Sequence, residues 1–345
     1  MVSGRIYQAL LLVLMAALTV PTPAPAANDG GNSAVMIMYH RFGETKYPST
    51  NVTLEQFEAH LKELKDGSYT VLPLPDIIAA LRRGNPLPDR TVGLSIDDAY
   101  LTVFTEAWPR LKAAGFPFTL FVATDPVDED TAGFMNWPQI RELADAGVTI
   151  GGHTGSHLHM PKAAFEKNLD ELSRSKKRFQ KMLDISPRIF AYPYGETSLA
   201  IQEMTKDDGF IAGFGQHSGA FNGASNLFDL PRFAMNEHYA GLARFRLAIN
   251  ALPLPVTDIT PADPLITTIN PPSMGFSFTG DARVLGQLSC FSSNAGKATL
   301  ERLGDRRIEI RVEKTFPIGR TRVNCTLPAS KGRWHWFGRQ FYRPE

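Results

Sequence analysis

TVGLSIDD, at residues 91–98, and FTLFVA, at residues 118–123, frame the segment that decides the fold. Each is a short run of apolar residues, which is typical of a buried strand. Between them, residues 101–114 have the composition of an amphipathic helix, and Gly115 follows at a position where helices commonly end. This order of strand, helix and strand predicts a parallel βαβ unit.

The same alternation continues on both sides of this unit. Further strands are expected at residues 34–39, 148–150, 188–192 and 210–214, and further helices from a capping box at Thr53 and Gln56, at 137–146 and at 165–183. Short apolar strands that alternate with helices predict an α/β fold, a parallel sheet covered by helices. Both an open sheet and a barrel fit this pattern, and both place their active sites at the carboxyl ends of the strands.

The pattern changes after residue 251. Residues 252–272 contain six prolines, which predicts a linker between a domain at 34–251 and a second domain at 273–345. Strands without helices are expected in the second domain, at residues 274–278, 284–291, 308–312, 323–327 and 334–342. They predict a small antiparallel β-sandwich. Trp334 and Trp336 share one face of the last strand, where they serve either as core or as a platform for sugar rings.

Residues 1–26 predict a signal peptide. Arg5 supplies a basic start, residues 9–20 are almost wholly apolar, and Ala24-Pro25-Ala26 resembles a cleavage site. The alternative is an uncleaved N-terminal anchor. In either case the remainder is expected to be exported, periplasmic or secreted, with no membrane span after cleavage. In an oxidising compartment the two cysteines, Cys290 and Cys325, are expected to form a disulfide.

The overall charge limits the class of partner. Lys and Arg together number 36 and Asp and Glu 35, so the chain is almost neutral. Nucleic-acid binding is not expected, because it normally needs a basic excess. The overall charge also gives no support to the steering of an acidic polymer.

Two motifs carry the chemistry. Asp97 and Asp98 end an apolar strand, where two carboxylates are costly to bury unless a cation compensates them. One could bind the cation while the other remains free as a base; the alternative is a helix cap beside a solvated loop residue. His153 and His157 follow a later strand at a spacing that places both on one face of a helical turn, unless they are merely surface histidines.

Asp98, His153 and His157 together form a set of two histidines and one carboxylate. Such a set leaves coordination positions open, which is typical of a catalytic metal site. Zinc suits the mixed nitrogen and oxygen ligands best, and cobalt, nickel and iron are also compatible. No H-E-x-x-H motif is present, so a metalloprotease of that type is not expected.

Three segments occur in a familiar order: Ser95-Ile96-Asp97-Asp98-Ala99, His153 to His157, and Pro193-Tyr194-Gly195. They resemble the motifs of the polysaccharide deacetylases, the NodB-like carbohydrate esterases of family 4, although Ala99 stands where a glycine is common. The resemblance covers residues 34–251. It implies a distorted (β/α) barrel of about seven strands and metal-dependent removal of N-acetyl groups from a polysaccharide that contains N-acetylglucosamine.

The resemblance also implies roles for single residues. Asp97 would be the general base, Asp98, His153 and His157 the metal ligands, and the backbone N–H of Tyr194 a donor to the oxyanion. The arginine that usually orients the base, near Ala191, is missing. We expect Arg232 to replace it, unless Arg232 is a surface arginine.

The general acid is expected from an unusual place. The Leu-x-His segment that usually supplies it is not found after residue 195, but Met38-Tyr39-His40 has that shape. This resembles the circularly permuted exopolysaccharide deacetylases of the poly-N-acetylglucosamine type. His40 is therefore expected to be the acid, brought to the site because the first and last strands of a closed barrel pair; His217 is the rival.

Two other functions remain open on sequence grounds. The same residues could remove O-acetyl groups from an acetylated glycan, because both reactions pass through an oxyanion at a carbonyl carbon. A catalytically inactive glycan-binding protein is the other alternative. The presence of Asp97 argues against it, since binding a metal alone does not require the base.

Overall fold

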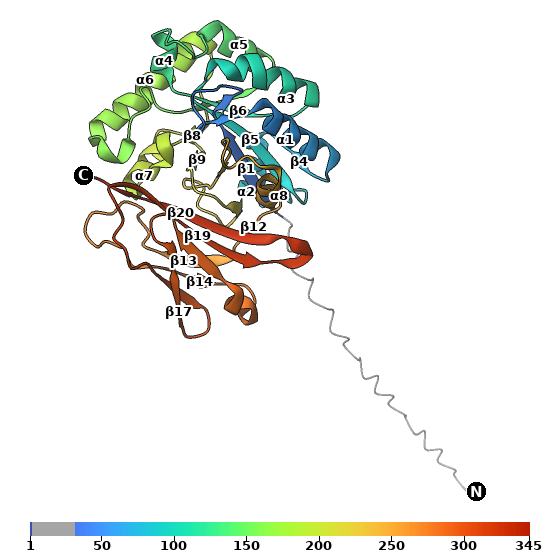
Figure 1. Cartoon of the computed structure of the whole chain (residues 1–345), viewed down its shortest axis with the longest axis vertical. Coiled ribbons are helices and arrows are strands. Elements are labelled where there is room, and N and C mark those ends of the chain that lie inside the picture. Colours follow the sequence, from blue (N-terminus) through green and yellow to red (C-terminus); the bar gives the residue numbers. More distant parts are fainter. Residues whose placement is uncertain (2–31) are drawn as a thin grey trace.

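The computed structural model describes Met1 and residues 32–345, and it consists of a barrel-like part followed by two β-sheets (Figure 1). The predicted signal peptide lies outside the described residues, apart from Met1. Among residues 32–345, no helix combines the length and the apolar character needed to cross a membrane.

A curled sheet with helices around it forms the first part (Figure 1). Its main path runs β10-β1-β5-β6-β7-β8-β9, with β11 and β4 added beside β1 and β5. The strands are β1 (Ser33–Tyr39), β4 (Thr70–Val71), β5 (Thr91–Asp97), β6 (Thr119–Val122), β7 (Thr149–Gly152), β8 (Ile189–Ala191), β9 (Ala212–Phe214), β10 (Ala220–Asn222) and β11 (Phe233–Ala234); β2 (Arg41–Phe42) and β3 (Asn51–Val52) pair separately. The helices are α1 (Leu54–Asp66), α2 (Leu74–Arg83), α3 (Trp108–Ala114), α4 (Thr124–Asp128), α5 (Trp137–Asp145), α6 (Phe165–Leu183), α7 (Leu199–Asp207) and α8 (Leu242–Ile249). The predicted distorted α/β barrel is confirmed.

Strand order explains how distant residues meet. β5 to β9 are each parallel to the next, so their carboxyl ends lie at one edge. β1 pairs in parallel with β5, with Tyr39 opposite Ile96. The residues that follow, His40 and Asp97, are therefore neighbours. The expected pairing of the first strand with the last strand of this part is present, because β11 pairs in parallel with β1, and β10 pairs with β1 in antiparallel orientation.

Local sequence accounts for most of the helix boundaries. Thr53 and Gln56 form the predicted capping box at the start of α1. The helix predicted at residues 101–114 is interrupted by a π-helical segment, Val103–Ala107. Pro109 lies two residues after this segment, and since proline has no N–H, a regular α-helical hydrogen-bond ladder cannot pass through it.

The second part contains two sheets that share one apolar core. One has the order β12-β20-β19-β15-β16 and the other β13-β14-β18-β17. The disulfide between Cys290 and Cys325 joins opposite positions of β15 and β19, as expected. Their strands are β12 (Leu252–Pro253), β13 (Val256–Thr260), β14 (Met274–Phe278), β15 (Ser289–Ser292), β16 (Gly296–Lys297), β17 (Thr299–Leu303), β18 (Arg307–Arg311), β19 (Gly319–Pro328) and β20 (Trp334–Arg343).

Two predictions for this part need correction. The segment 252–272 is not simply a linker, because β12 pairs with β20 and β13 pairs with β14. The strand expected at 284–291 is wrong in its first half, where Ala282–Gln287 forms a 3-10 helix capped by the Asp281 side chain. Apolar residues in this short helix face the core, so their pattern in the sequence resembles that of a strand.

Candidate active site

Three side chains converge on one point at the carboxyl edge of the barrel sheet. Oδ1 of Asp98 lies 3.3 Å from Nε2 of His153 and 3.3 Å from Nε2 of His157. One ligand atom from each residue fits within a span of 4.8 Å. Asp98 Oδ1 and His153 Nε2 are buried and have no hydrogen-bond partner. Buried polar atoms without partners are costly, so this set of donors fits a divalent cation.

Neighbouring groups prepare both histidines as ligands. Nδ1 of His153 lies 2.7 Å from the carbonyl oxygen of Ala191, to which it donates when protonated there. This contact fixes the tautomer that leaves Nε2 with a free lone pair. For His157, burial and the nearby His153 lower the pKa to about 4, so its ring is neutral at pH 7.

The loop that carries these histidines is not the helical turn expected from their spacing. Residues 153–157 have no helical assignment, and Thr154 and His157 have positive φ angles of 64° and 57°. Glu171 on α6 holds the loop: one carboxylate oxygen accepts hydrogen bonds from the backbone N–H groups of Gly155 and Ser156, at 2.9 and 2.7 Å. A loop fixed in this way brings both imidazoles to one point without a helix.

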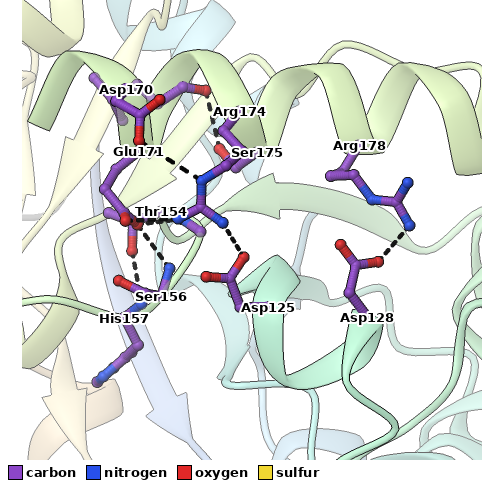
Figure 2. Close-up of polar contacts among 12 residues, drawn as sticks. Asp125, Asp128, Thr154, Ser156, His157, Asp170, Glu171, Arg174, Ser175 and Arg178 are labelled. Carbon is purple, nitrogen blue, oxygen red and sulfur yellow. Dashed lines mark hydrogen bonds and ion pairs between the residues drawn. The ribbon is translucent and has the colours of Figure 1, made fainter. Parts of the chain in front are cut away.

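Figure 2 shows how Glu171 is itself held in place. Its other carboxylate oxygen accepts a hydrogen bond from Arg174 at 2.6 Å, and Arg174 also pairs with Asp125 on α4. Glu171 is fully buried, and these contacts with Arg174 and the backbone stabilise its charge. α4 and α6 are thus tied to the histidine loop through one carboxylate.

Asp97 lies next to this set, held by an arginine. Both Nη atoms of Arg232 donate to the two carboxylate oxygens of Asp97, at 2.6 and 2.8 Å, and both side chains are fully buried. Arg232 Nε donates to the Gly215 carbonyl at 2.8 Å. Burial alone would raise the pKa of Asp97, but the charges of Arg232, His153 and His40 hold it below its ordinary value. The carboxylate is therefore charged and fixed in orientation.

The two candidate acids lie in different places. Nε2 of His40 is 4.0 Å from Oδ2 of Asp97, and its side chain is 13% exposed toward the cleft described below. His217 is buried instead, with Nδ1 3.9 Å from Asp229 Oδ1, and it lines a separate cavity. Only His40 of the two shares a cavity with Asp98 and His157.

Tyr194 lies between the metal ligands and the C-terminal sheets. Its backbone has a positive φ of 59°, and its ring meets the His157 ring edge-on with centroids 4.5 Å apart. The Tyr194 ring also stacks parallel on the His159 ring, with ring centroids 3.9 Å apart. His159 in turn bonds to Glu196 at 2.7 Å. These contacts fix the loop that presents the backbone of Tyr194.

A cleft of about 840 Å³ opens over these residues. Its lining includes His40, Asp98, His157 and Tyr194. We call the residues Asp97, Asp98, His153, His157 and His40 the metal side of the cleft. A volume of this size accommodates several sugar units, which suits an extended ligand.

The family model for polysaccharide deacetylases matches residues 84–212, which include Asp97, Asp98, His153, His157 and Tyr194. The chain carries a polysaccharide deacetylase domain. It is accordingly an enzyme of the class that hydrolyses acetyl amides or esters of glycans. Two curated relatives and two solved structures extend this finding beyond the matched residues.

The putative polysaccharide deacetylase YxkH of Bacillus subtilis is 26% identical over 208 residues, which cover 60% of this chain and 73% of that protein. The poly-beta-1,6-N-acetyl-D-glucosamine N-deacetylase of Staphylococcus aureus is 25% identical over 232 residues, with 60% of this chain and 80% of that protein covered. Both matches make this deacetylase domain related to enzymes of the exopolysaccharide branch.

Two solved structures share the fold. Streptococcus pyogenes deacetylase PplD, in complex with acetate, has a TM-score of 0.58 at 22% identity, over 63% of this chain and 98% of that chain. IcaB from Ammonifex degensii has a TM-score of 0.55 at 22% identity, with the same two coverages. More than a third of the deacetylase described here therefore lies outside each match.

Sequence reasoning missed Glu171. A signal existed, because Asn168, Leu172, Ser175 and Phe179 are the buried positions of α6 and Glu171 falls on the same face. A carboxylate at a buried helical position needs donors, and the nearby histidine loop supplies them. For Trp336, both expected roles have support, because its side chain packs partly buried against the barrel core and also lines the cleft.

Proposed function

We propose that this protein is a metal-dependent N-deacetylase that acts on a polysaccharide containing N-acetylglucosamine. One observation carries the proposal: Asp98, His153 and His157 meet beside Asp97, whose two oxygens are held by Arg232. A binding protein needs no such buried, charged carboxylate next to its metal ligands. The Staphylococcus aureus relative, named for poly-beta-1,6-N-acetyl-D-glucosamine, supports the substrate class.

Asp98, His153 and His157 would hold the cation, with zinc the best match to the donor set and cobalt, nickel and iron compatible. When bound, a divalent ion lowers the pKa of water from about 15.7 to near 7 and polarises a carbonyl oxygen. Asp97 accepts the proton of the attacking water, because Arg232 keeps this carboxylate ionised and oriented.

Two further groups complete the reaction. The backbone N–H of Tyr194 donates to the oxygen that becomes negatively charged at the acetamide carbon. His40 gives a proton to the departing nitrogen, because an unprotonated amide nitrogen is a very poor leaving group. Its position 4.0 Å from Asp97 and on the cleft supports this role. Arg232 acts through Asp97 and does not touch the substrate.

We further propose that the protein works outside the cytoplasm, in the periplasm or after secretion. The Cys290–Cys325 disulfide fits an oxidising compartment. A polysaccharide of the cell surface is also found there. Mass determination of the N-terminus of the mature protein tests this point: a start at or near residue 27 supports export with cleavage.

Acetate release from a panel of glycans tests the proposed activity. The panel contains poly-β-1,6-N-acetylglucosamine, a chitin oligomer and O-acetylated xylan, each assayed with and without a chelator. We expect acetate from an N-acetylated member and none after chelation. Release from xylan alone would make the protein an O-acetyl esterase. Binding without release from any member would make it an inactive glycan-binding protein.

A further inference from the structure

The cleft over the metal side has a second wall, which comes from the C-terminal sheets. Ser293, Arg320, Arg322, Asn324 and Trp336 line the same cavity as His40 and Asp98. In Figure 1, β19 and β20 run directly beneath the barrel-like part. The C-terminal sheets are therefore part of the active-site cleft.

Strand geometry explains why these side chains face the cleft. Successive residues of a strand point to opposite faces, so Arg320, Arg322 and Asn324 share one face of β19. Val323 and Cys325, on the other face, are buried in the core of the sheets. The contact with the barrel is close: a Cβ on Gly338 would lie 2.0 Å from the carbonyl oxygen of Ser218.

Hydrogen bonds fix this wall against the site. Nε of Arg322 donates to the carbonyl oxygen of Gln216 at 3.1 Å. Gln340, on the neighbouring strand, donates to the carbonyl oxygen of Tyr194 at 3.0 Å. The guanidinium of Arg320 lies 5.5 Å from the centre of the Tyr194 ring. The same Tyr194 ring contacts the candidate metal ligand His157.

Arg244 of α8, Arg320 and Arg322 also line the cleft, and we call these three residues its basic side. The only carboxylate among the lining residues is Asp98, which is a candidate metal ligand. Nε of Arg320 lies 3.6 Å from Oε1 of Glu196, which partly balances the charge of this arginine. Within residues 32–345, neither Arg244 nor Arg322 has a carboxylate within ion-pair distance.

The positive charges of Arg244 and Arg322 are unusual because both are largely removed from water. Nη1 of Arg244 is buried and has no hydrogen-bond partner. Burial lowers the pKa of both Arg244 and Arg322, and the charge of Arg320 lowers that of Arg322 further. Arginine nevertheless remains protonated, so Arg244 and Arg322 bring two largely desolvated positive charges to the cleft. Arg244 lies against the Tyr239 and Phe233 rings and Arg322 bonds to a backbone carbonyl, but neither has a carboxylate within ion-pair distance among residues 32–345.

We propose that the basic side binds an anionic group of the glycan, so that the preferred substrate is an N-acetylhexosamine polymer that also carries carboxylate or phosphate. Guanidinium groups bind both anions through paired hydrogen bonds. Trp336, partly exposed in the same wall, offers a face for the sugar ring. The inference rests on the proposed deacetylase function and narrows its substrate class. The near-neutral charge of the whole chain conceals this local excess.

Matched substrates test the proposal. Heparosan, with alternating uronic acid and N-acetylglucosamine, is compared with heparosan whose carboxyl groups are reduced to alcohols, with neutral poly-β-1,6-N-acetylglucosamine and with a polymer of N-acetylglucosamine 1-phosphate. We expect kcat/KM for acetate release to be higher on an anionic polymer than on either neutral one. A preference for heparosan identifies the anion as carboxylate, and a preference for the phosphate polymer identifies it as phosphate.

Variants locate the effect on the basic side. Arg322→Gln and Arg244→Gln should each lower kcat/KM on the preferred anionic polymer by about 10-fold or more, and should lower it less on the neutral polymers. Arg311→Gln is the control of equal charge, because Arg311 lies on β18 and outside the cleft lining. A wild-type preference for neutral polymers, or equal losses on anionic and neutral polymers, overturns the proposal.

A binding measurement separates this proposal from the proposed function. Calorimetry with Asp97→Asn protein, which should bind without turnover, compares heparosan and the phosphate polymer with carboxyl-reduced heparosan. Tighter binding of an anionic polymer, weakened by Arg322→Gln, supports the basic side even if no polymer releases acetate. Equal binding of charged and neutral polymers contradicts it even if acetate is released.

Discussion

Asp97 and Arg322 are charged side chains at the same cleft, but they differ in how far other residues of the chain balance their charges. Asp97 has two hydrogen bonds from Arg232, and Glu171 behind the histidine loop is held by two backbone N–H groups, Arg174 and Lys167. Arg322 has one bond to a backbone carbonyl and no carboxylate within ion-pair distance among residues 32–345. Asp97 and Glu171 thus have their charges balanced within the chain, whereas the charge of Asp98 would be balanced by a cation and the charges of the basic side by an anionic ligand.

This difference separates two kinds of function. Groups that are held by the chain keep their geometry before the substrate arrives, which is what chemistry requires. Groups without a partner from the chain gain most when a ligand supplies the opposite charge, which favours selectivity. Changes on the metal side should therefore lower turnover with every glycan, whereas changes on the basic side should alter the choice of substrate.

The largest effect is expected at His153. His153→Ala removes one of the three ligand atoms that meet at this point, so metal and activity should be lost together. Metal content per chain and acetate release are measured on the same preparation. Unchanged metal content in this variant would show that the ligand set is wrong.

Asp97→Asn is expected to reduce turnover by about 10²–10⁴-fold while the metal stays bound, because this residue is proposed as the base and not as a ligand. The substitution preserves size but cannot accept the proton. Asp98→Asn serves as the comparison and should lose the metal. The reverse pattern would mean that the two aspartates exchange roles.

His40→Ala should reduce turnover on an acetamide by about 10²–10⁴-fold, since departure of the amine needs a proton. The loss should be smaller on an activated acetyl ester, whose leaving group needs little protonation. Kinetics on both substrates check this difference. Equal losses on both would indicate a structural role, and an intact His40→Ala with an inactive His217→Ala would transfer the acid to His217.

A smaller effect is expected at Glu171, which contacts neither substrate nor metal. Glu171→Gln weakens the bonds to the backbone of Gly155 and Ser156, so metal affinity should fall by about 10- to 100-fold. Activity should return when excess metal is added. Glu166→Gln, at an exposed position in the first turn of the same helix, is the control and should keep the wild-type affinity. If Glu171→Gln bound the metal as tightly as the wild type, Glu171 would have no positioning role.

Sequence patterns predicted the barrel well because its strands are continuous apolar runs and its helices have clear faces and caps. They also placed Asp97, Asp98, His153 and His157 at strand ends, where parallel strands meet. The loop geometry at His153 was not predictable, since Thr154 and His157 adopt positive φ angles that their residue types do not suggest. The C-terminal wall was missed because alternation shows which residues share a face, not what that face contacts.

The pairing of Arg232 with Asp97 likewise could not be predicted from the local sequence. The absence of an arginine near Ala191 raised the question of a substitute, and Arg232 was one candidate among residues far along the chain. Its position follows from Pro231 and β11, which pass beside β1 and direct the side chain under the sheet edge. No local pattern encodes that path, so only the three-dimensional structure shows the contact.

Reconstitution of the metal-free protein tests the central claim most directly. Protein stripped with a chelator is titrated with Zn²⁺, while bound metal and acetate release from the best glycan of the panel are followed together. The stripped protein should release no acetate, and acetate release should rise with added Zn²⁺ until one ion is bound per chain. Full activity without metal, or a protein that binds one ion and releases no acetate from any N-acetylated glycan, would contradict the central claim.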